Sequence, residues 1–352
     1  MSKLIVVLGA TGGQGTAIVD SFLKLPDWRV RGLTRNAASQ KAQSLAAKGV
    51  EVTEANVDDQ ASLEKAFQGA TAIFAFTDYY DYFFQLGPEE SMARELQQGS
   101  NLARAAAKIP TLERYIWSTL PNTDLITKGQ AIVPHFQGKA NVDVFIKENL
   151  AELYEKTTFT IFTIFAANVT HYEIFRPIYI VSNLPSPLEF QISDRSLRVK
   201  PSAKKWVQFY PVHPDTPYPS IGNHRVNSGI FVRGVIENPP PSGTYVKCNV
   251  EDLTMDTFLA AWGRSSGVSP ESNSTAVIQI SMEQYIALWG EMGEEQASQW
   301  RFFQFMKDAG VNPNKVAGFK LVEGKDLLSE DLRATLVPTE EGMKTMDWSS
   351  FH

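Results

Sequence analysis

Residues 4–15 of the chain read LIVVLGATGGQG, an apolar run that breaks into glycines and resumes as an amphipathic segment. This order predicts a buried strand, a tight turn and the start of a helix. Gly9 can adopt the positive φ of the turn, Gly12 lacks a Cβ that would hold a pyrophosphate off the backbone, and Gly15 allows close helix–strand packing. The stretch therefore predicts a dinucleotide-binding unit with its phosphates at the positive end of the helix.

Strand-like and helix-like segments alternate through the first half of the chain. The next strands are expected at 28–33, 50–55, 72–76 and 114–117, with helices between them at 38–48, 61–67 and 89–108. Because such alternation gives parallel strands with right-handed crossovers, the sequence predicts an α/β fold, a doubly wound parallel sheet of Rossmann type.

After residue 119 the pattern loosens. A loop is expected at 121–124, helices at 135–149, 221–236, 254–264, 282–289 and 294–308, and a further strand at 159–165. Proline-rich turns interrupt the region beyond residue 168, which is typical of a smaller mixed α/β C-terminal lobe. We expect an NADP(H)-binding domain over residues 1–155 and a substrate or partner lobe over residues 156–352. Residues 221–236 are expected to return to the first domain.

Composition excludes several classes of protein. The formal charge of -6 gives no footprint for nucleic acid, and Cys248 is the single cysteine, which suits a reducing compartment. The five histidines are scattered, so no metal site is expected. The start of the chain leaves no room for a targeting peptide, and the apolar run at 159–169 is too short to span a membrane. We therefore expect a cytoplasmic protein with possible access to the nucleus.

The second predicted strand ends in Thr34-Arg35, where an NAD enzyme usually carries an acidic residue. Arginine at this place favours a 2′-phosphate, which predicts NADP(H) as the cofactor. The glycine-rich stretch, this strand end, Asn56-Val-Asp-Asp59, Trp117-Ser-Thr119 and His135-Phe-Gln-Gly-Lys-Ala-Asn-Val142 together resemble the NmrA-like group of atypical short-chain dehydrogenases. The resemblance covers about residues 1–240.

The resemblance implies a role for each matching position. Thr11, Gly12, Gln14 and Gly15 would lie at the pyrophosphate, with Arg35 at the 2′-phosphate and Asn56 near the adenine. Phe76 and Thr77 would lie beside the ribose, Lys139 at the nicotinamide ribose, and Phe165 and Asn168 near the nicotinamide. Some similar proteins resemble isoflavone and phenylcoumaran reductases, which use a lysine in hydride transfer. Others resemble the nitrogen-metabolite repressor and its redox-sensor kin, which bind the dinucleotide without known turnover.

Standard short-chain dehydrogenases pair a serine with Tyr-x-x-x-Lys, and this chain has His135 in the tyrosine position. Residues four apart lie on one face of a helix, so His135 and Lys139 can both face a cleft. Either Ser118 or Thr119 can supply a hydroxyl. These residues predict catalytic roles for Lys139, for Ser118 and for His135 as proton donor. The alternative for His135 is that it only begins the helix.

The aromatic run at 79–84 indicates either a pocket wall for a flat apolar ligand or packing under the second lobe. We therefore expect an NADPH-dependent oxidoreductase that reduces a carbonyl or conjugated double bond of an aromatic or polyketide-like small molecule. The alternative is a non-catalytic NADP(H)-sensing regulator that binds a protein partner, which the missing tyrosine favours. No role is assigned to His171, Tyr172, His213 or His224, and Met292, Trp300 and Met306 are expected in core or contact surface.

Overall fold

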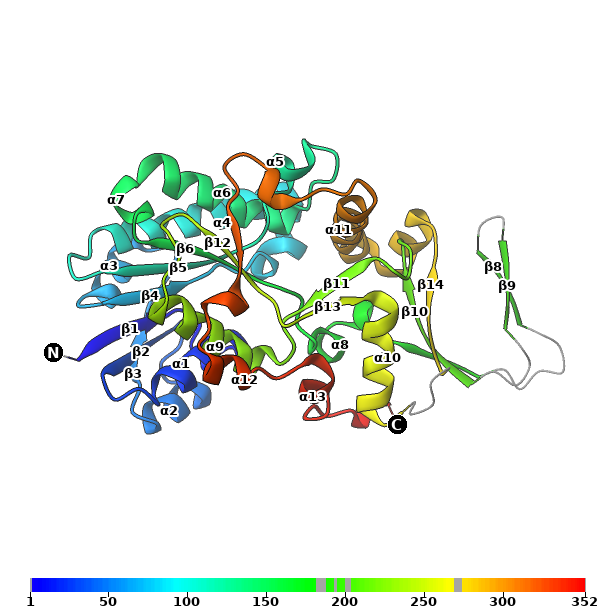
Figure 1. Ribbon diagram of the computed structural model, residues 1–352, viewed down its shortest axis with the longest axis horizontal. Helices are drawn as coiled ribbons and strands as arrows, with labels where there is room; N and C mark the ends of the chain where they lie inside the picture. Colours follow the sequence, from blue (N-terminus) through cyan, green and yellow to red (C-terminus); the bar gives the residue numbers. More distant parts are fainter. Residues whose placement is uncertain (1, 182–187, 193–194, 200–203, 269–273, 352) are drawn as a thin grey trace.

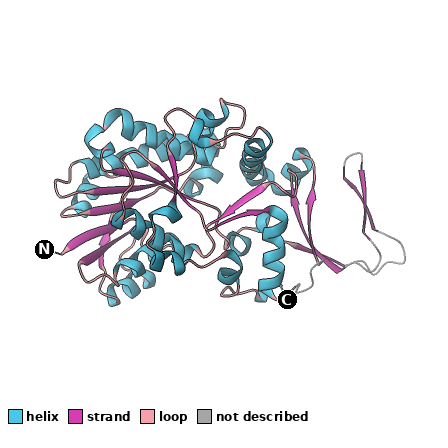
Figure 2. Ribbon diagram, viewed as in Figure 1, coloured by secondary structure: helices cyan, strands magenta, loops and turns pink. Residues whose placement is uncertain are grey.

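The computed structural model describes residues 2–181, 188–192, 195–199, 204–268 and 274–351. A twisted sheet with helices on both faces forms one side of the molecule, and a smaller lobe of mixed sheets and helices forms the other (Figure 1). Figure 2 shows the strands of the larger sheet running side by side between two layers of helix.

The larger sheet has eight strands, all parallel, in the order β15-β12-β6-β5-β4-β1-β2-β3. In chain order they are β1 (Lys3–Val7), β2 (Trp28–Thr34), β3 (Glu51–Glu54), β4 (Ala72–Ala75), β5 (Arg114–Thr119), β6 (Thr157–Phe162), β12 (Tyr245–Cys248) and β15 (Leu321–Glu323). The strand order reverses between β1 and β4, and open α/β sheets bind ligands at such a switch point. The predicted doubly wound fold is confirmed.

The helices are α1 (Gly13–Phe22), α2 (Gln40–Ala47), α3 (Gln60–Phe67), α4 (Tyr80–Ala107), α5 (Thr123–Thr127), α6 (Pro134–Asn149), α7 (Ala151–Tyr154), α8 (Asn168–His171), α9 (His224–Glu237), α10 (Met255–Ser266), α11 (Met282–Asp308), α12 (Glu330–Ala334) and α13 (Thr339–Met343). Within the described residues, none of these helices combines the length and the apolar composition needed to cross a membrane.

Alternate residues of the central strand enter two separate cores. Leu4 and Val6 belong to the core under α3, α4 and α6, whereas Ile5 and Val7 belong to the core under α1 and α9. A strand covered on both faces needs an unbroken apolar sequence, which β1 has. Burial of each such side chain contributes about 1.5–3 kcal/mol. The two cores hold the carboxyl ends of the strands in place at the ligand-binding edge.

Two local predictions differ from the structure. The helix expected at 89–108 begins earlier, because α4 starts at Tyr80, within the aromatic run at 79–84, and continues to Ala107 across a break at Gly87, where φ is 74°. Pro88 then starts the second part of this helix, as its fixed φ allows. Residues 121–124 are not simply a loop either, since α5 begins at Thr123. The Asn122 side chain accepts a hydrogen bond from the Leu125 N–H at 2.9 Å and caps this helix.

The second half of the chain contributes to both parts of the molecule. β6, β12 and β15 extend the parallel sheet, and α9 packs so closely on α1 that a Cβ at Gly229 would lie 2.1 Å from the Ala17 carbonyl oxygen. The smaller lobe contains β7 (Ile178–Val181), β10 (Lys204–Tyr210) and β14 (Thr275–Gln279) in one sheet, and the pairs β11 (Pro217–Ser220) with β13 (Glu251–Thr254) and β8 (Leu188–Ile192) with β9 (Arg195–Val199). Helix α11, with its break at Gly290, lies between this lobe and α6.

Candidate cofactor and substrate site

The glycine-rich turn has the geometry of a phosphate cradle. Gly9 has a φ of 59°, and a Cβ at Gly15 would lie 2.2 Å from the Gly9 carbonyl oxygen. Gly12 is the N-cap residue of α1, and no side chain caps the first N–H groups of this helix. Because these N–H groups and the helix dipole favour an anion, the turn fits the pyrophosphate of a dinucleotide. Thr11 lies in the same turn.

The predicted adenosine end lies on an exposed edge of the sheet. Arg35 follows β2, and its side chain is 81% exposed. Its Nη1 donates to Asp81 Oδ2 at 2.8 Å, so the guanidinium already has an anionic partner on α4. Burial and the nearby Asp78 carboxylate raise the pKa of Asp81, whereas Arg35 lowers it. Asn56 is also exposed, and its Oδ1 accepts the N–H of Asp58 at 3.0 Å.

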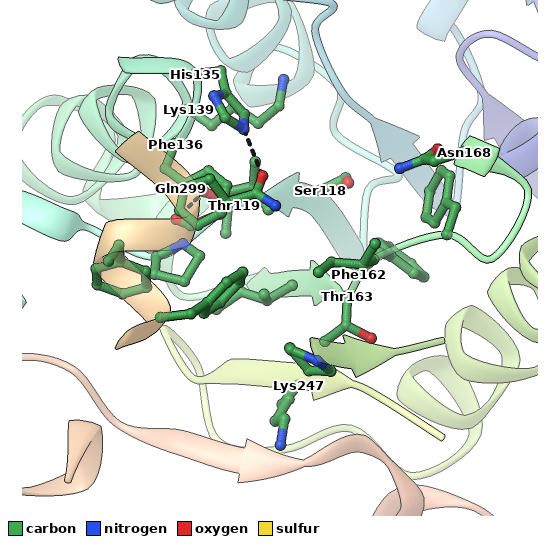
Figure 3. A pocket seen from close by; sticks show the side chains of 18 of the residues that line it. Ser118, Thr119, His135, Phe136, Lys139, Phe162, Thr163, Asn168, Lys247 and Gln299 are labelled. Carbon is green, nitrogen blue, oxygen red and sulfur yellow. Dashed lines mark hydrogen bonds between the residues drawn. The ribbon is translucent and has the colours of Figure 1, made fainter. Parts of the chain in front are cut away.

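A cavity of about 430 Å³ opens at the carboxyl ends of β4, β5 and β6, under α6 and α11. Figure 3 shows its residues arranged around a common space. Eight of the predicted site residues line it: Gln14, Phe76, Thr77, Ser118, His135, Lys139, Phe165 and Asn168. Gly9, Thr11, Gly12 and Gly15 remain in the adjoining turn, and Arg35 and Asn56 are not among the lining residues.

Most of the remaining wall is apolar. Phe136, Ile161, Phe302, Phe303 and Phe319 line the cavity, together with Met292 and Met306, which the sequence placed in core or contact surface. Trp300 is fully buried, as expected of a core residue. An apolar pocket with a few polar groups is typical of a small-molecule site.

The Lys139 ammonium group is held by Thr77, which follows β4, and by Glu95 of α4. Its Nζ donates to the Thr77 carbonyl oxygen at 2.5 Å and forms an ion pair with the Glu95 carboxylate of α4. The Glu95 side chain is 1% exposed, and its Oε2 has no hydrogen-bond partner in the described residues. Gly138 makes room for that oxygen, because a Cβ there would lie 2.4 Å from it. Lys139 therefore reaches the cavity as half of a buried ion pair.

His135 has both ring nitrogens occupied by α11. Its Nδ1 lies 2.6 Å from Glu295 Oε1, and its Nε2 lies 3.0 Å from Gln299 Oε1, the contact drawn dashed in Figure 3. The His135 backbone N–H also donates to Glu295 Oε1 at 3.0 Å. A carboxylate only accepts, so Nδ1 carries a proton. The Tyr79 hydroxyl donates to the other oxygen of Glu295 at 3.3 Å. His135 therefore ties α6 to α11 at the wall of the cavity.

The two hydroxyls at the end of β5 have different partners. Thr119 Oγ1 donates to Asp143 Oδ2 at 2.9 Å, on the side of the sheet covered by α6. Burial raises the pKa of Asp143, and its hydrogen bond from Thr119 opposes that rise. The Ser118 hydroxyl makes no hydrogen bond within the described part of the chain and lines the cavity. Ser118 is therefore the hydroxyl that a ligand can reach.

The aromatic run at 79–84 serves both roles that the sequence left open. Tyr80 lines the cavity and its hydroxyl accepts from Gln296 Nε2 at 2.7 Å. Tyr79 and Phe83 are buried, and Phe84 is 63% exposed.

Sequence reasoning missed Glu95, Glu295 and Gln299, which hold the two basic residues of the site. Glu95 lies 44 residues before Lys139, and Glu295 lies 160 residues after His135. Acidic residues on amphipathic helices are expected to face solvent, but Glu95 and Glu295 are buried. The sequence alone gives no signal of that burial.

Comparison with known proteins agrees with this architecture. The profile of the NmrA-like family matches residues 1–283. The chain belongs to the NmrA-like family. Among curated relatives, the oxidoreductase himF of Aspergillus japonicus is 34% identical over 140 residues, 40% of this chain and 41% of that protein. The oxidoreductase cpsB of Aspergillus campestris is 30% identical over 142 residues, 40% of this chain and 41% of that protein. The matched part spans about two-fifths of these relatives.

Solved structures share the fold across nearly the whole chain. NmrA, a negative transcriptional regulator, in complex with NAD has a TM-score of 0.67 and 18% identity, and the match covers 99% of both chains. Citrobacter sp. triphenylmethane reductase complexed with NADP(H) has a TM-score of 0.62 and 16% identity, covering 98% of this chain and 99% of that one. One fold thus carries both a regulator and a reductase.

Proposed function

We propose that this NmrA-like protein is an NADPH-dependent oxidoreductase that reduces a carbonyl or conjugated double bond of an aromatic or polyketide-like small molecule. The observation that carries the proposal is the apolar, aromatic-lined cavity of about 430 Å³ that meets Ser118 and Lys139 at the carboxyl ends of the strands. A cavity of this size and lining suits a flat ligand of low polarity. Its place beside the glycine-rich turn suits reaction with a bound dinucleotide.

The dinucleotide would run from the exposed edge at Arg35, across the turn at Gly12, to Phe165 and Asn168. The positive φ of Gly9 and the close approach of Gly15 support the pyrophosphate position. NAD is bound in the NmrA structure and NADP(H) in the triphenylmethane reductase, which supports a dinucleotide of this type. The preference for NADP(H) rests on Arg35, which must exchange Asp81 for the 2′-phosphate.

When bound, the nicotinamide supplies the hydride. The Ser118 hydroxyl is free to donate to a substrate oxygen, where negative charge develops during reduction. Lys139 stabilises that charge and binds the ribose, and Glu95 and Thr77 fix its ammonium group. The Gln299 amide oxygen only accepts, so His135 Nε2 carries a proton toward it; if the substrate oxygen replaces Gln299, Nε2 gives that oxygen the final proton. The apolar wall excludes water and so strengthens these interactions.

The second candidate is a non-catalytic NADP(H)-sensing regulator that binds a protein partner. Two observations favour it. The tyrosine of standard short-chain dehydrogenases is replaced by His135, and that histidine is engaged by Glu295 and Gln299. The similar NmrA structure is that of a negative transcriptional regulator.

Turnover separates the two candidates. The purified protein is mixed with NADPH and a panel of quinones, enones and aromatic aldehydes, and NADPH oxidation is followed by absorbance. The reductase proposal expects oxidation with at least one class, abolished in Lys139→Ala and retained in Lys147→Ala, a matched change at an exposed position of the same helix. Tight NADPH binding without oxidation across the panel would instead support the regulator.

A further inference from the structure

His224 is a buried imidazole whose ring nitrogens have no hydrogen-bond partner among the described residues. It begins α9 and is 6% exposed. Its ring stacks on Phe165 with centroids 4.4 Å apart and an interplanar angle of 6°. Nδ1 is fully buried without a partner. Leaving a buried polar group unpaired costs about 1–3 kcal/mol, so a ring held this way is expected to meet a polar partner when the protein works.

The ring lies directly against the glycine-rich turn. His224 Nε2 would be 2.4 Å from a Cβ built on Gly13, the first residue of α1. The guanidinium carbon of Arg225 would be 3.7 Å from the same Cβ, and this side chain forms no salt bridge with a described residue. The first turns of α1 and α9 therefore meet. The imidazole of His224 and the guanidinium of Arg225 flank the glycine-rich turn at this point. Both groups and both helix dipoles favour an anion.

The surroundings of His224 keep it neutral in the free protein. Burial, the Arg225 charge and His171 lower its pKa to about 4. His171 belongs to α8, and its Nδ1 lies 2.8 Å from the Ala167 carbonyl oxygen. No acidic side chain contributes to the shift. A doubly charged pyrophosphate at the turn would supply the missing negative charge and favour the imidazolium.

We propose that His224 is a pyrophosphate-binding residue of the dinucleotide site, reaching a phosphate oxygen across the glycine-rich turn and taking up a proton from solvent as it binds. Arg225 is the second cation of this wall. The inference rests on the proposed dinucleotide binding. On this proposal the phosphate site includes the start of α9, in the second half of the chain, as well as the glycine-rich turn at residues 9–15.

Calorimetry of NADPH and NADH binding at about pH 6.5, in buffers of different ionisation enthalpy, tests the proposal. The unaltered protein should take up a measurable fraction of a proton with either dinucleotide, because both carry the same pyrophosphate. His224→Phe keeps the stacking on Phe165 and removes the nitrogens. Its affinity for both dinucleotides should fall about ten-fold or more, and the proton uptake should vanish. His224→Gln, which keeps a donor that does not titrate, should retain more affinity than His224→Phe but take up no proton.

His213→Phe is the matched control, because His213 is exposed and bonded to Asp215, and it should change neither quantity. Adenosine 2′-monophosphate, which lacks the pyrophosphate, should bind His224→Phe and the unaltered protein alike. Unchanged dinucleotide affinity in His224→Phe, or binding to the unaltered protein without proton uptake, would overturn the assignment of His224 and leave dinucleotide binding intact. Failure of the unaltered protein to bind either dinucleotide would overturn both proposals.

Discussion

Two histidines, His135 at the wall of the cavity and His224 beside the glycine-rich turn, are each 6% exposed, yet their partners differ completely. His135 has Glu295 on one ring nitrogen and Gln299 on the other. His224 has neither ring nitrogen bonded within the described residues, although its face is well packed on Phe165. Burial alone therefore does not say what a histidine does. The partner of each nitrogen separates a residue that joins two helices from one that is open to a ligand.

The largest expected effect is on folding stability. His135→Phe should lower the free energy of unfolding by about 3–5 kcal/mol, because it leaves the Glu295 carboxylate buried without its main partner. His224→Phe should not lower it, since no hydrogen bond is lost and a buried unpaired nitrogen is removed. Urea denaturation of both variants measures the difference. Equal losses in the two variants would break the comparison.

The ion pair between Lys139 and Glu95 sharpens the comparison. Lys139→Met should lower the free energy of unfolding by about 1.5–3 kcal/mol, because it leaves Glu95 buried with a charge and the Thr77 hydroxyl as its remaining donor. Adding Glu95→Gln removes that charge and should restore much of the stability, while turnover stays absent. The measurement is urea denaturation of the single and double variants. If the second change lowers stability further, the ion pair is not what made the first change costly.

The dependence of stability on pH should report His224. Its pKa of about 4 lies below the ordinary 6.5, so between these pH values the unfolded chain binds a proton that the folded chain does not. Stability is therefore lost as pH falls through this window. From about pH 7.5 to about pH 5, the unaltered protein should lose about 1–2 kcal/mol more than His224→Phe. Parallel pH profiles for the two proteins would show that His224 is not held neutral.

The smallest effect concerns Arg35, an exposed cation that already has a partner. Asp81→Asn frees its guanidinium, and an exposed ion pair of this kind is worth about 0.2–1 kcal/mol. NADPH affinity should therefore rise by up to about five-fold with little change for NADH. Arg35→Ala should remove most of the preference for NADPH. Equal affinity of the unaltered protein for the two dinucleotides would contradict the prediction of NADP(H) at this strand end.

The fold was predictable because its signals are local. The apolar run before Gly9 and the amphipathic segment after Gly15 define a strand, a turn and a helix within a few residues. Two helices were expected at 282–289 and 294–308, and the structure has α11 over both ranges with a break at Gly290. The error was also local: the helix expected from residue 89 begins at Tyr80, where the aromatic run buries Tyr79 and Phe83.

The residues at the carboxyl ends of the strands could be identified from the sequence, because strand period and glycine conformation depend on neighbouring residues. Ser118 was expected at such a strand end, and four-residue helical spacing put His135 and Lys139 on one helix face; all three line one cavity. What each of these side chains contacts depends on packing between distant segments. Glu95 and Glu295 come from distant parts of the chain, as does His224, which packs against Gly13. The energy of a buried polar group depends on its partner in space.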